Sequence, residues 1–234
     1  MRLAVVTGGS RGLGAALCEH YSAAGWRVVE FSRTAPREYS VKLDLADPQR
    51  ATHTFDQAFG SLAASKPTEV VAFSNAATID PAGPVERVRP EEIVRHISAN
   101  LTSAILFARA FVAAFQKTDC PKTLVNISSG AARHGIAGWS LYCATKAAVD
   151  NYMRSVAAEQ ADRSHPIRAI AVNPGVMDTQ MQAQVRGTSL DLFPSVDRYI
   201  RLKQEGSLAD PAAVAGQIAE IVASRPDPGT VYQV

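Results

Sequence analysis

The sequence has few cysteines and no excess of charge of either sign, and both shortages exclude classes of protein. Its three cysteines, Cys18, Cys120 and Cys143, are odd in number and widely spaced, so they indicate reduced thiols and not a disulfide framework. The 24 lysines and arginines stand against 22 acids, a formal net charge of +2. This balance argues against a surface that binds nucleic acid or an anionic membrane.

Metal ligands and long apolar runs are also missing. None of the five histidines lies at metal-ligand spacing from a cysteine or another histidine, so no metal site is expected. No apolar run approaches the ~20 residues of a membrane-spanning helix, and no signal-peptide pattern precedes the first strand-like segment. We therefore expect a cytoplasmic protein without a nucleic-acid or membrane partner.

What the sequence does contain is an alternation of two kinds of segment. Short β-rich runs alternate with alanine-rich helical runs, which predicts one α/β domain over residues 1–234. The expected fold is Rossmann-like and doubly wound, with a parallel sheet of about seven strands and helices on both faces. The expected strands are 2–7, 27–31, 41–44, 69–74, 122–127, 167–172 and 229–233. The expected helices are 12–24, 48–63, 90–117, 140–160 and 210–224. The segment 32–40 is too short for a crossover helix, so an extended loop is expected there.

A glycine-rich turn, Thr7-Gly-Gly-Ser-Arg-Gly-Leu-Gly14, follows the first expected strand. Gly8, Gly12 and Gly14 have the spacing GxxxGxG, which differs from the GxGxxG of the common dinucleotide fingerprint. The physics is the same, since glycines let the backbone approach a pyrophosphate and the following helix offers free N–H groups. The turn predicts a dinucleotide cofactor, with a glycine-rich turn that binds nothing as the alternative.

The end of the second strand indicates which cofactor is used. An NAD enzyme of this architecture has an acid there to bind the ribose 2′-hydroxyl. Here the position is Ser32, followed by Arg33, and Arg11 lies in the glycine-rich turn. Two guanidinium groups without a carboxylate suit the 2′-phosphate of NADPH/NADP+. Two alternatives stay open: Glu30 takes the acid's place if the strand register is shifted by two, or the arginines are ordinary surface charges.

Tyr142 and Lys146 are one helical turn apart and therefore lie on one helix face. A free phenol has a pKa of roughly 10. A cation ~5 Å away at an effective dielectric of ~20 is expected to lower that pKa by roughly two units. Such a phenol can give or take a proton near neutral pH, although a Tyr–Lys pair at this spacing is common in helices.

Three polar residues complete the candidate site. Ser129 ends the apolar stretch Val125-Asn-Ile-Ser-Ser129, where doubly wound sheets bind their ligands, so its hydroxyl is expected to meet a substrate carbonyl. Ser128 is the alternative, or it satisfies the backbone of the turn. Asn100 lies in the middle of the expected helix 90–117, a poor place for asparagine, so it either faces solvent or does polar work inside.

Together these motifs resemble the short-chain dehydrogenase/reductase family over essentially the whole chain. The resemblance also rests on Asp44-Leu45, Ser74-Asn-Ala-Ala77 and Asn173-Pro-Gly-Val-Met-Asp-Thr179. It implies that Tyr142 is the general acid in reduction, and that Lys146 lowers its pKa and holds the nicotinamide ribose. Ser129 would orient the carbonyl and Asn100 would support a water relay. Ser129 precedes Tyr142 by thirteen residues, which resembles the family's interval and favours it over Ser128.

The resemblance also assigns the cofactor contacts. Asp44 and Leu45 would contact adenine, Asn75 and Ala76 would line the adenosine ribose, and the segment after Asn173 would bind the carboxamide end. The full expected set is Gly8, Ser10, Arg11, Gly12, Leu13, Gly14, Ser32, Arg33, Asp44, Leu45, Asn75, Ala76, Tyr142, Lys146, Pro174, Gly175, Val176 and Thr179.

Within that family, the segments 138–146, 174–182 and 202–208 look like sepiapterin reductases and bacterial benzil reductases. Sepiapterin reductases anchor the pterin with an acid near the C-terminus, where this chain offers Gln233. That difference weakens the pterin assignment and leaves diketones and other activated ketones open. The segment 176–205 is expected to form a substrate lid. The expected substrate contacts are Ser129, Trp139, Tyr142 and Met177.

The sequence therefore predicts NADPH-dependent reduction of a small-molecule ketone or diketone to an alcohol. The alternatives are an NADPH-binding sensor without catalysis, a short-chain alcohol dehydrogenase with another substrate, and a structural protein. The presence of both Tyr142 and Lys146 favours an enzyme. Helices 90–117 and 140–160 are long and rich in small apolar residues, and such helices commonly pair across a two-fold axis in this family. A homodimer or homotetramer is expected.

Overall fold

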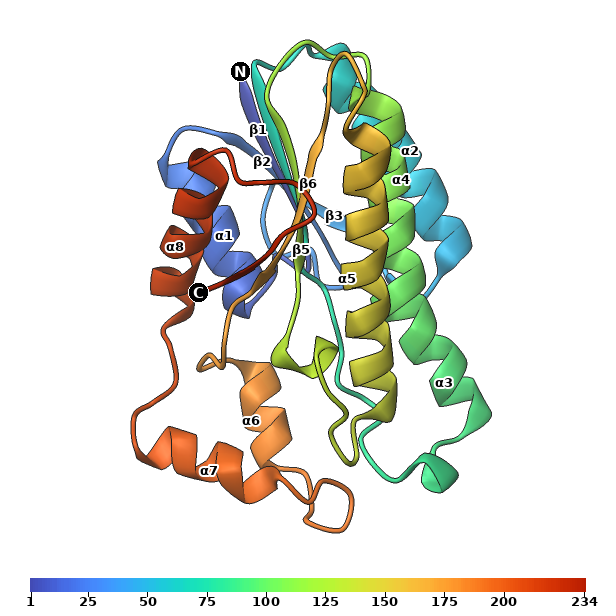
Figure 1. The fold of residues 1–234 in the computed structure, drawn as a ribbon, viewed down its shortest axis with the longest axis vertical. Coiled ribbons are helices and arrows are strands. Elements are labelled where there is room, and N and C mark those ends of the chain that lie inside the picture. Colours follow the sequence, from blue (N-terminus) through green and yellow to red (C-terminus); the bar gives the residue numbers. More distant parts are fainter.

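Apolar segments form the seven strands of one parallel sheet in the computed structural model, which describes residues 1–234 (Figure 1). The strands are β1 (Arg2–Thr7), β2 (Arg27–Ser32), β3 (Ser40–Lys42), β4 (Glu69–Ser74), β5 (Lys122–Ile127), β6 (Arg168–Asn173) and β7 (Val231–Gln233). Their order is β3-β2-β1-β4-β5-β6-β7, and every pairing is parallel. The order reverses beside β1, which is where doubly wound sheets bind ligands. The predicted fold class is confirmed.

The helices begin where the sequence supplies caps. Asp47 and Asp210 each accept a hydrogen bond from a backbone N–H two or three residues ahead, and each precedes a proline at the first helical position. The helices are α1 (Gly12–Ala23), α2 (Pro48–Ala64), α3 (Pro90–Ile97), α4 (Ser103–Phe115), α5 (Ser140–Gln160), α6 (Gln180–Arg186), α7 (Val196–Gln204) and α8 (Pro211–Ala223). Short 3₁₀ turns are η1 (Val85–Arg87) and η3 (Gly130–Ala132).

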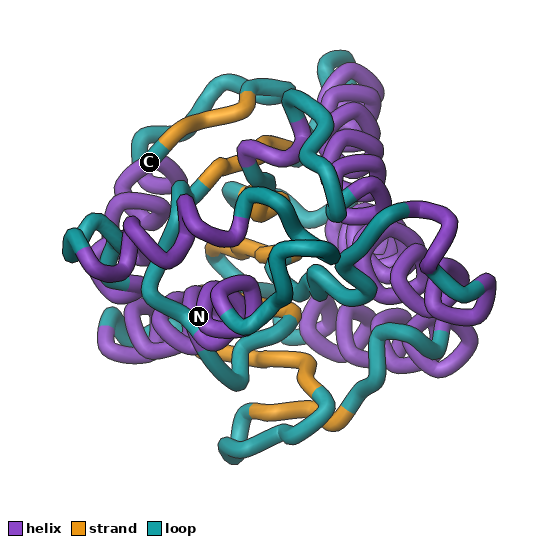
Figure 2. Tube along the Cα trace, turned by 90° about the horizontal axis from the view of Figure 1, so that it is seen from below, coloured by secondary structure: helices purple, strands orange, loops and turns teal.

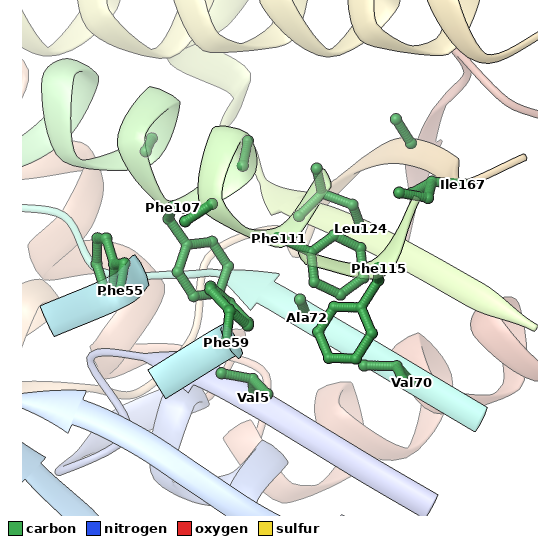
Figure 3. Close-up of a cluster of buried hydrophobic side chains, with 14 of the residues drawn as sticks. Val5, Phe55, Phe59, Val70, Ala72, Phe107, Phe111, Phe115, Leu124 and Ile167 are labelled. Carbon is green, nitrogen blue, oxygen red and sulfur yellow. The ribbon is translucent and has the colours of Figure 1, made fainter. Parts of the chain in front are cut away.

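Two apolar clusters, one on each face of the sheet, hold the layers together. Figure 1 shows α1 and α8 on one face and α2, α4 and α5 on the other. On the second face α2 and α4 interlock through phenylalanine rings, with the Phe59 and Phe107 centroids 5.2 Å apart. Phe111 and Phe115 extend this stack toward the sheet (Figure 3). Burial of these rings makes the sheet a rigid platform for the loops at its ends.

The single helix expected over 90–117 is interrupted. The π-helical turn η2 (Ser98–Thr102) separates α3 from α4, and it contains Asn100. Taken as one unit, Pro90–Phe115 is long and apolar enough to span a membrane by length and composition alone, which the sequence reading did not anticipate. Its Phe107, Phe111 and Phe115 are fully buried against the sheet, so here it is a helix of the protein core.

The connections at the carboxyl ends of the strands differ from one another. No helix lies between β2 and β3, so the extended loop expected over 32–40 is confirmed. The segment 176–205 forms α6 and α7, two helices that were not predicted. Both lie beyond the carboxyl ends of the strands in Figure 1, and Figure 2 shows the molecule from that end. The residues predicted for the site are carried by these connections.

Candidate functional site

A cavity of about 780 Å³ lies at the carboxyl ends of the central strands. Its walls come from the connections after β1, β2, β4, β5 and β6, from the first turns of α5, and from α6 and α7. All of the residues predicted for cofactor binding, catalysis and substrate contact line it. Motifs that are far apart in the sequence thus converge on one site.

The glycine-rich turn between β1 and α1 forms one end of the cavity. Gly8 and Gly12 have φ angles of 72° and 55°, in the left-handed region that favours glycine. Gly14 packs so tightly that a Cβ there would overlap the Gly8 carbonyl oxygen and lie 2.6 Å from Nδ2 of Asn75. The turn leaves the N–H groups at the start of α1 beside the cavity, an arrangement suited to a pyrophosphate.

Asn75 and Thr7 hold this turn against β4. Asn75 Nδ2 donates to the carbonyl oxygens of Thr7, at 2.9 Å, and Gly8, at 3.3 Å. Thr7 Oγ1 accepts from the backbone N–H groups of Asn75 and Ala76 at 3.0 and 3.1 Å. Both side-chain donors of Asn75 are therefore used within the protein, and its side chain braces the glycine-rich turn.

At the adenosine end of the cavity, β2 ends at Ser32, the position expected from the sequence. The alternative that put Glu30 at the strand end is wrong, because Glu30 is fully buried inside the strand. Ser32 Oγ donates to Glu30 Oε1 at 3.0 Å and accepts from the N–H of Ala35 at 3.0 Å. Its hydroxyl is thus occupied in shaping the loop, and Arg33 is the exposed charge that follows it.

Arg11, the other arginine predicted to meet the cofactor, also lines the cavity. Its Nη1 donates to Gln180 Oε1, at the start of α6, at 2.5 Å. The glycine-rich turn is thereby connected to the segment 176–205. Neither arginine forms a salt bridge, but Arg11 is held by Gln180, so Arg33 is the freer of these two cations.

Tyr142, Lys146 and Ser129 meet at the other end of the cavity. Tyr142 and Lys146 occupy the first two turns of α5, and Lys146 Nζ lies 5.7 Å from the centre of the Tyr142 ring. Lys146 Nζ donates to the carbonyl oxygen of Ile127 at 2.6 Å. The Ser129 side chain lies near enough to the Tyr142 hydroxyl to lower its pKa. Phenol, hydroxyl and ammonium are therefore close together at the end of β5.

The expected lowering of the Tyr142 pKa is wrong. Burial raises the pKa of Tyr142 to about 12, and the neighbouring Ser129 side chain only partly offsets that effect. Burial also lowers the pKa of Lys146 to about 8, against the opposing influence of Asp150. Lys146 lies over the ring and is hydrogen-bonded elsewhere. Consequently the phenol holds its proton at neutral pH, which is the form that a proton donor needs.

Ser128, the alternative to Ser129, also lines the cavity, but its hydroxyl is bound within the protein. Its Oγ donates to Asp150 Oδ2 at 2.6 Å, and Asn126 Nδ2 donates to Asp150 Oδ1 at 3.0 Å. All three of these side chains are buried. Asp150 on α5 thus binds the end of β5 through Ser128 and Asn126, and it leaves Ser129 as the serine beside Tyr142.

Asn100 points inward, which decides between the two readings of its mid-helix position. Its Oδ1 accepts from the N–H of Thr78 at 2.8 Å, and its Nδ2 donates to the carbonyl oxygen of Thr78 at 2.7 Å. These bonds tie the π-helical turn to the loop after β4. A π turn displaces one residue from the helical register, which is how Asn100 reaches that loop.

An aromatic wall closes the cavity beside Tyr142. Trp139 stacks on Phe193 with centroids 4.4 Å apart and planes 13° apart, and Tyr199 lies 5.5 Å from Trp139. Met181 packs with this group, whereas Met177 lines the cavity but packs against the α1–α8 cluster. Met181 and Tyr199 belong to the predicted lid, but they were not among the expected substrate contacts; the helical spacing of Val196, Tyr199 and Ile200 was the available signal.

Comparison with known proteins identifies the family to which the chain is similar. A family model described as short chain dehydrogenase matches residues 2–189. Benzil reductase ((S)-benzoin forming) of Bacillus subtilis (strain 168) is 33% identical over 239 residues, which cover 100% of this chain and 98% of the relative. Sepiapterin reductase of Meriones unguiculatus is 37% identical over 137 residues, 57% of this chain and 49% of the relative. The crystal structure of the KRED1-Pglu enzyme matches with a TM-score of 0.83 and 25% identity, over 99% of this chain and 100% of that one.

Proposed function

Because the chain belongs to the short chain dehydrogenase family, we propose that it catalyses the NADPH-dependent reduction of a small activated ketone or diketone to an alcohol. The observation that carries the proposal is the layout of the cavity. A glycine-rich turn and the free cation Arg33 line one end, and Tyr142, Ser129 and Lys146 line the other. The name of the Bacillus subtilis relative, benzil reductase, supports a diketone as the substrate class.

The protein backbone around the cavity is suited to bind a dinucleotide. Gly14 lets the start of α1 pack directly against the Gly8 carbonyl, where any side chain would clash, and the start of α1 offers N–H groups to a pyrophosphate. Arg33 would hold the 2′-phosphate, Lys146 would hold the nicotinamide ribose, and the segment Pro174–Thr179 would hold the carboxamide. NADPH, when bound, supplies the hydride.

The chain itself supplies the proton. The Ser129 hydroxyl donates a hydrogen bond to the substrate carbonyl, and the protonated phenol of Tyr142 gives its proton to the oxygen as negative charge develops there. The Lys146 ammonium stabilises the phenolate that remains. The carbonyl carbon gains the hydride, the oxygen gains the phenol proton, and Tyr142 recovers a proton from solvent. The aromatic wall formed by Trp139 and Tyr199 keeps water away from this exchange.

The direct test is turnover with a panel of ketones. Purified protein with NADPH and either benzil, sepiapterin or simple monoketones is followed by the loss of absorbance of the reduced nicotinamide. We expect activity with the diketone, and isolation of the hydroxyketone product. If NADPH binds but no ketone in the panel is reduced, the proposed function is wrong and the protein is a binder of the cofactor.

The cofactor assignment predicts a selective effect of Arg33→Ala. Loss of a charge-assisted bond to the 2′-phosphate should weaken NADPH binding about 10–100-fold and leave NADH binding unchanged. Arg27→Ala is the matched control, since it removes the same charge from the exposed far end of β2. Binding is measured by titration of nicotinamide fluorescence. Equal use of NADPH and NADH by the unaltered protein would contradict the assignment.

The lowered pKa of Lys146 predicts an alkaline limit to activity. Lys146 is charged below its pKa of about 8 and neutral above it, and only the charged form stabilises the phenolate. The value of kcat/KM for NADPH, which reports ionisations of the free enzyme, should therefore be constant from neutral pH to about pH 8 and fall above it. A profile that stays flat until the phenol ionises would show that Lys146 does not act through its charge.

We also propose a homodimer, or a tetramer built from dimers, through the helices on the α4–α5 face. Val94 and Ile97 on α3 are large apolar side chains that are exposed by 65% and 36%. An interface that uses one patch twice would cover them. Light scattering at micromolar concentration should give twice or four times the chain mass, and a monomer would contradict the proposal.

A further inference from the structure

His96 is buried in the last turn of α3 and takes no part in the chemistry described above. It is 1% exposed. Its Nδ1 lies 2.6 Å from the carbonyl oxygen of Asp80. Its Nε2 lies 3.0 Å from Asn100 Nδ2 and 3.3 Å from Thr145 Oγ1. The ring thus contacts the loop after β4, the π-helical turn and α5.

These contacts fix the protonation state of the imidazole. A carbonyl oxygen only accepts, so the nitrogen beside Asp80 must carry a hydrogen. The Asn100 amide cannot be turned round, because its Oδ1 accepts from the N–H of Thr78 and its Nδ2 donates to the carbonyl of the same residue. Its N–H group therefore faces His96 Nε2, which must accept. Only the neutral Nδ1–H tautomer satisfies both neighbours.

Asn100 depends on this ring for its third hydrogen bond. Thr78 fixes the amide from one side, and His96 fixes it from the helix side. Thr145, which lies between Tyr142 and Lys146 on α5, contacts the same imidazole nitrogen. His96 therefore joins the asparagine of the π-helical turn to the helix that carries the phenol and the ammonium.

We propose that His96 is a positioning residue of the reductase site, and that its neutral Nδ1–H form holds the Asn100 amide in the orientation required for turnover. The proposal rests on the proposed function. Protonation would give the ring a second N–H group, at Nε2, directly opposite the Asn100 N–H. The two donors would repel each other, and either the amide or the imidazole would have to move. The site should therefore lose activity on the acid side.

The surroundings of His96 favour the neutral form. Burial lowers the pKa of the ring below its ordinary value, the more so because Lys146 on α5 is positively charged. Asp80, in the loop after β4, and the backbone of Leu141 on α5 act in the opposite direction, but burial outweighs them. The neutral form that supports Asn100 is therefore present at neutral pH, and it is lost only when the pH falls below the range of an exposed histidine.

The test compares pH profiles of kcat for the native protein, His96→Gln and His53→Gln. His53 is exposed on α2 and serves as the control. We expect an acid limb in the native profile and in the control, and no such limb in His96→Gln. At pH 7 that variant should lose about three- to tenfold in kcat, the effect of one hydrogen bond, with NADPH affinity unchanged. An acid limb that persists unchanged in His96→Gln would overturn the proposal.

Nuclear magnetic resonance of the histidine ring keeps the inference independent of any substrate. With ring-labelled histidine, the native protein should show His96 as the Nδ1–H tautomer at pH 7. The side-chain amide signal of Asn100 should shift as His96 titrates. An Nε2–H tautomer, or a titration that leaves Asn100 unmoved, would refute the positioning role. A native protein that reduces no ketone would instead refute the proposed function. The spectrum would still show whether His96 accepts a hydrogen bond from Asn100.

Discussion

Replacing Tyr142 with phenylalanine is expected to lower turnover by about 10²–10⁴-fold, the usual effect of removing a general acid. The substitution keeps the ring, which packs edge-on against Trp139 with centroids 5.5 Å apart. It removes only the hydroxyl, and the neighbouring Ser129 Oγ still accepts from the N–H of Ala131 at 3.2 Å. The fold should therefore persist. NADPH should bind as before, because the glycine-rich turn and Arg33 are untouched. Single-turnover kinetics with a diketone, together with fluorescence titration of NADPH, measures both quantities.

Tyr152→Phe is the matched control for this variant. Tyr152 lies on the same helix and packs beside the cluster of α2 and α4, outside the cavity. Its loss of a hydroxyl should leave turnover unchanged. Near-normal turnover of Tyr142→Phe, with NADPH binding intact, would mean that the proton comes from another group and that the proposed mechanism is wrong.

The sequence predicts the sheet well because each strand is marked by local chemistry. Strands such as Glu69–Ser74 and Lys122–Ile127 are short apolar runs with polar flanks, and they were located to the residue. The helix starts at Asp47 and Asp210 were legible from a capping carboxylate and the proline that follows. The convergence of the site residues followed from topology, since the carboxyl ends of parallel strands meet at one edge.

The sequence could not predict features that depend on contacts between distant segments. The π-helical turn exists because Asn100 reaches Thr78, twenty-two residues earlier in the chain. The occupied hydroxyl of Ser32 depends on the buried Glu30 beside it, and the raised pKa of Tyr142 depends on burial that no spacing rule describes. The segment 176–205 lacks a long periodic pattern, so its two short helices form only against the rest of the fold.

The largest effect on the fold is expected from Gly14→Ala. In an exposed helix interior this change adds about 1 kcal/mol of stability, because alanine is the better helix former. Here the new methyl group would overlap the Gly8 carbonyl oxygen and lie 2.6 Å from Asn75 Nδ2. Overpacking of this kind costs about 1–3 kcal/mol or more. At roughly 2–4 °C per kcal/mol for a chain of this size, the midpoint of thermal unfolding should fall by up to about 10 °C. NADPH should no longer raise that midpoint, since the displaced backbone is the one proposed to meet the pyrophosphate.

Gly60→Ala separates the packing effect from helix propensity. Gly60 lies in the interior of α2, is exposed, and has nothing within 4 Å of the position of a Cβ. The same substitution there should raise the unfolding midpoint slightly, through propensity alone. The two variants thus differ only in what the methyl group meets. If Gly14→Ala unfolded at the native temperature and NADPH still stabilised it, the turn would have room for a side chain. The close approach of backbone and pyrophosphate would then not explain the glycine at this position.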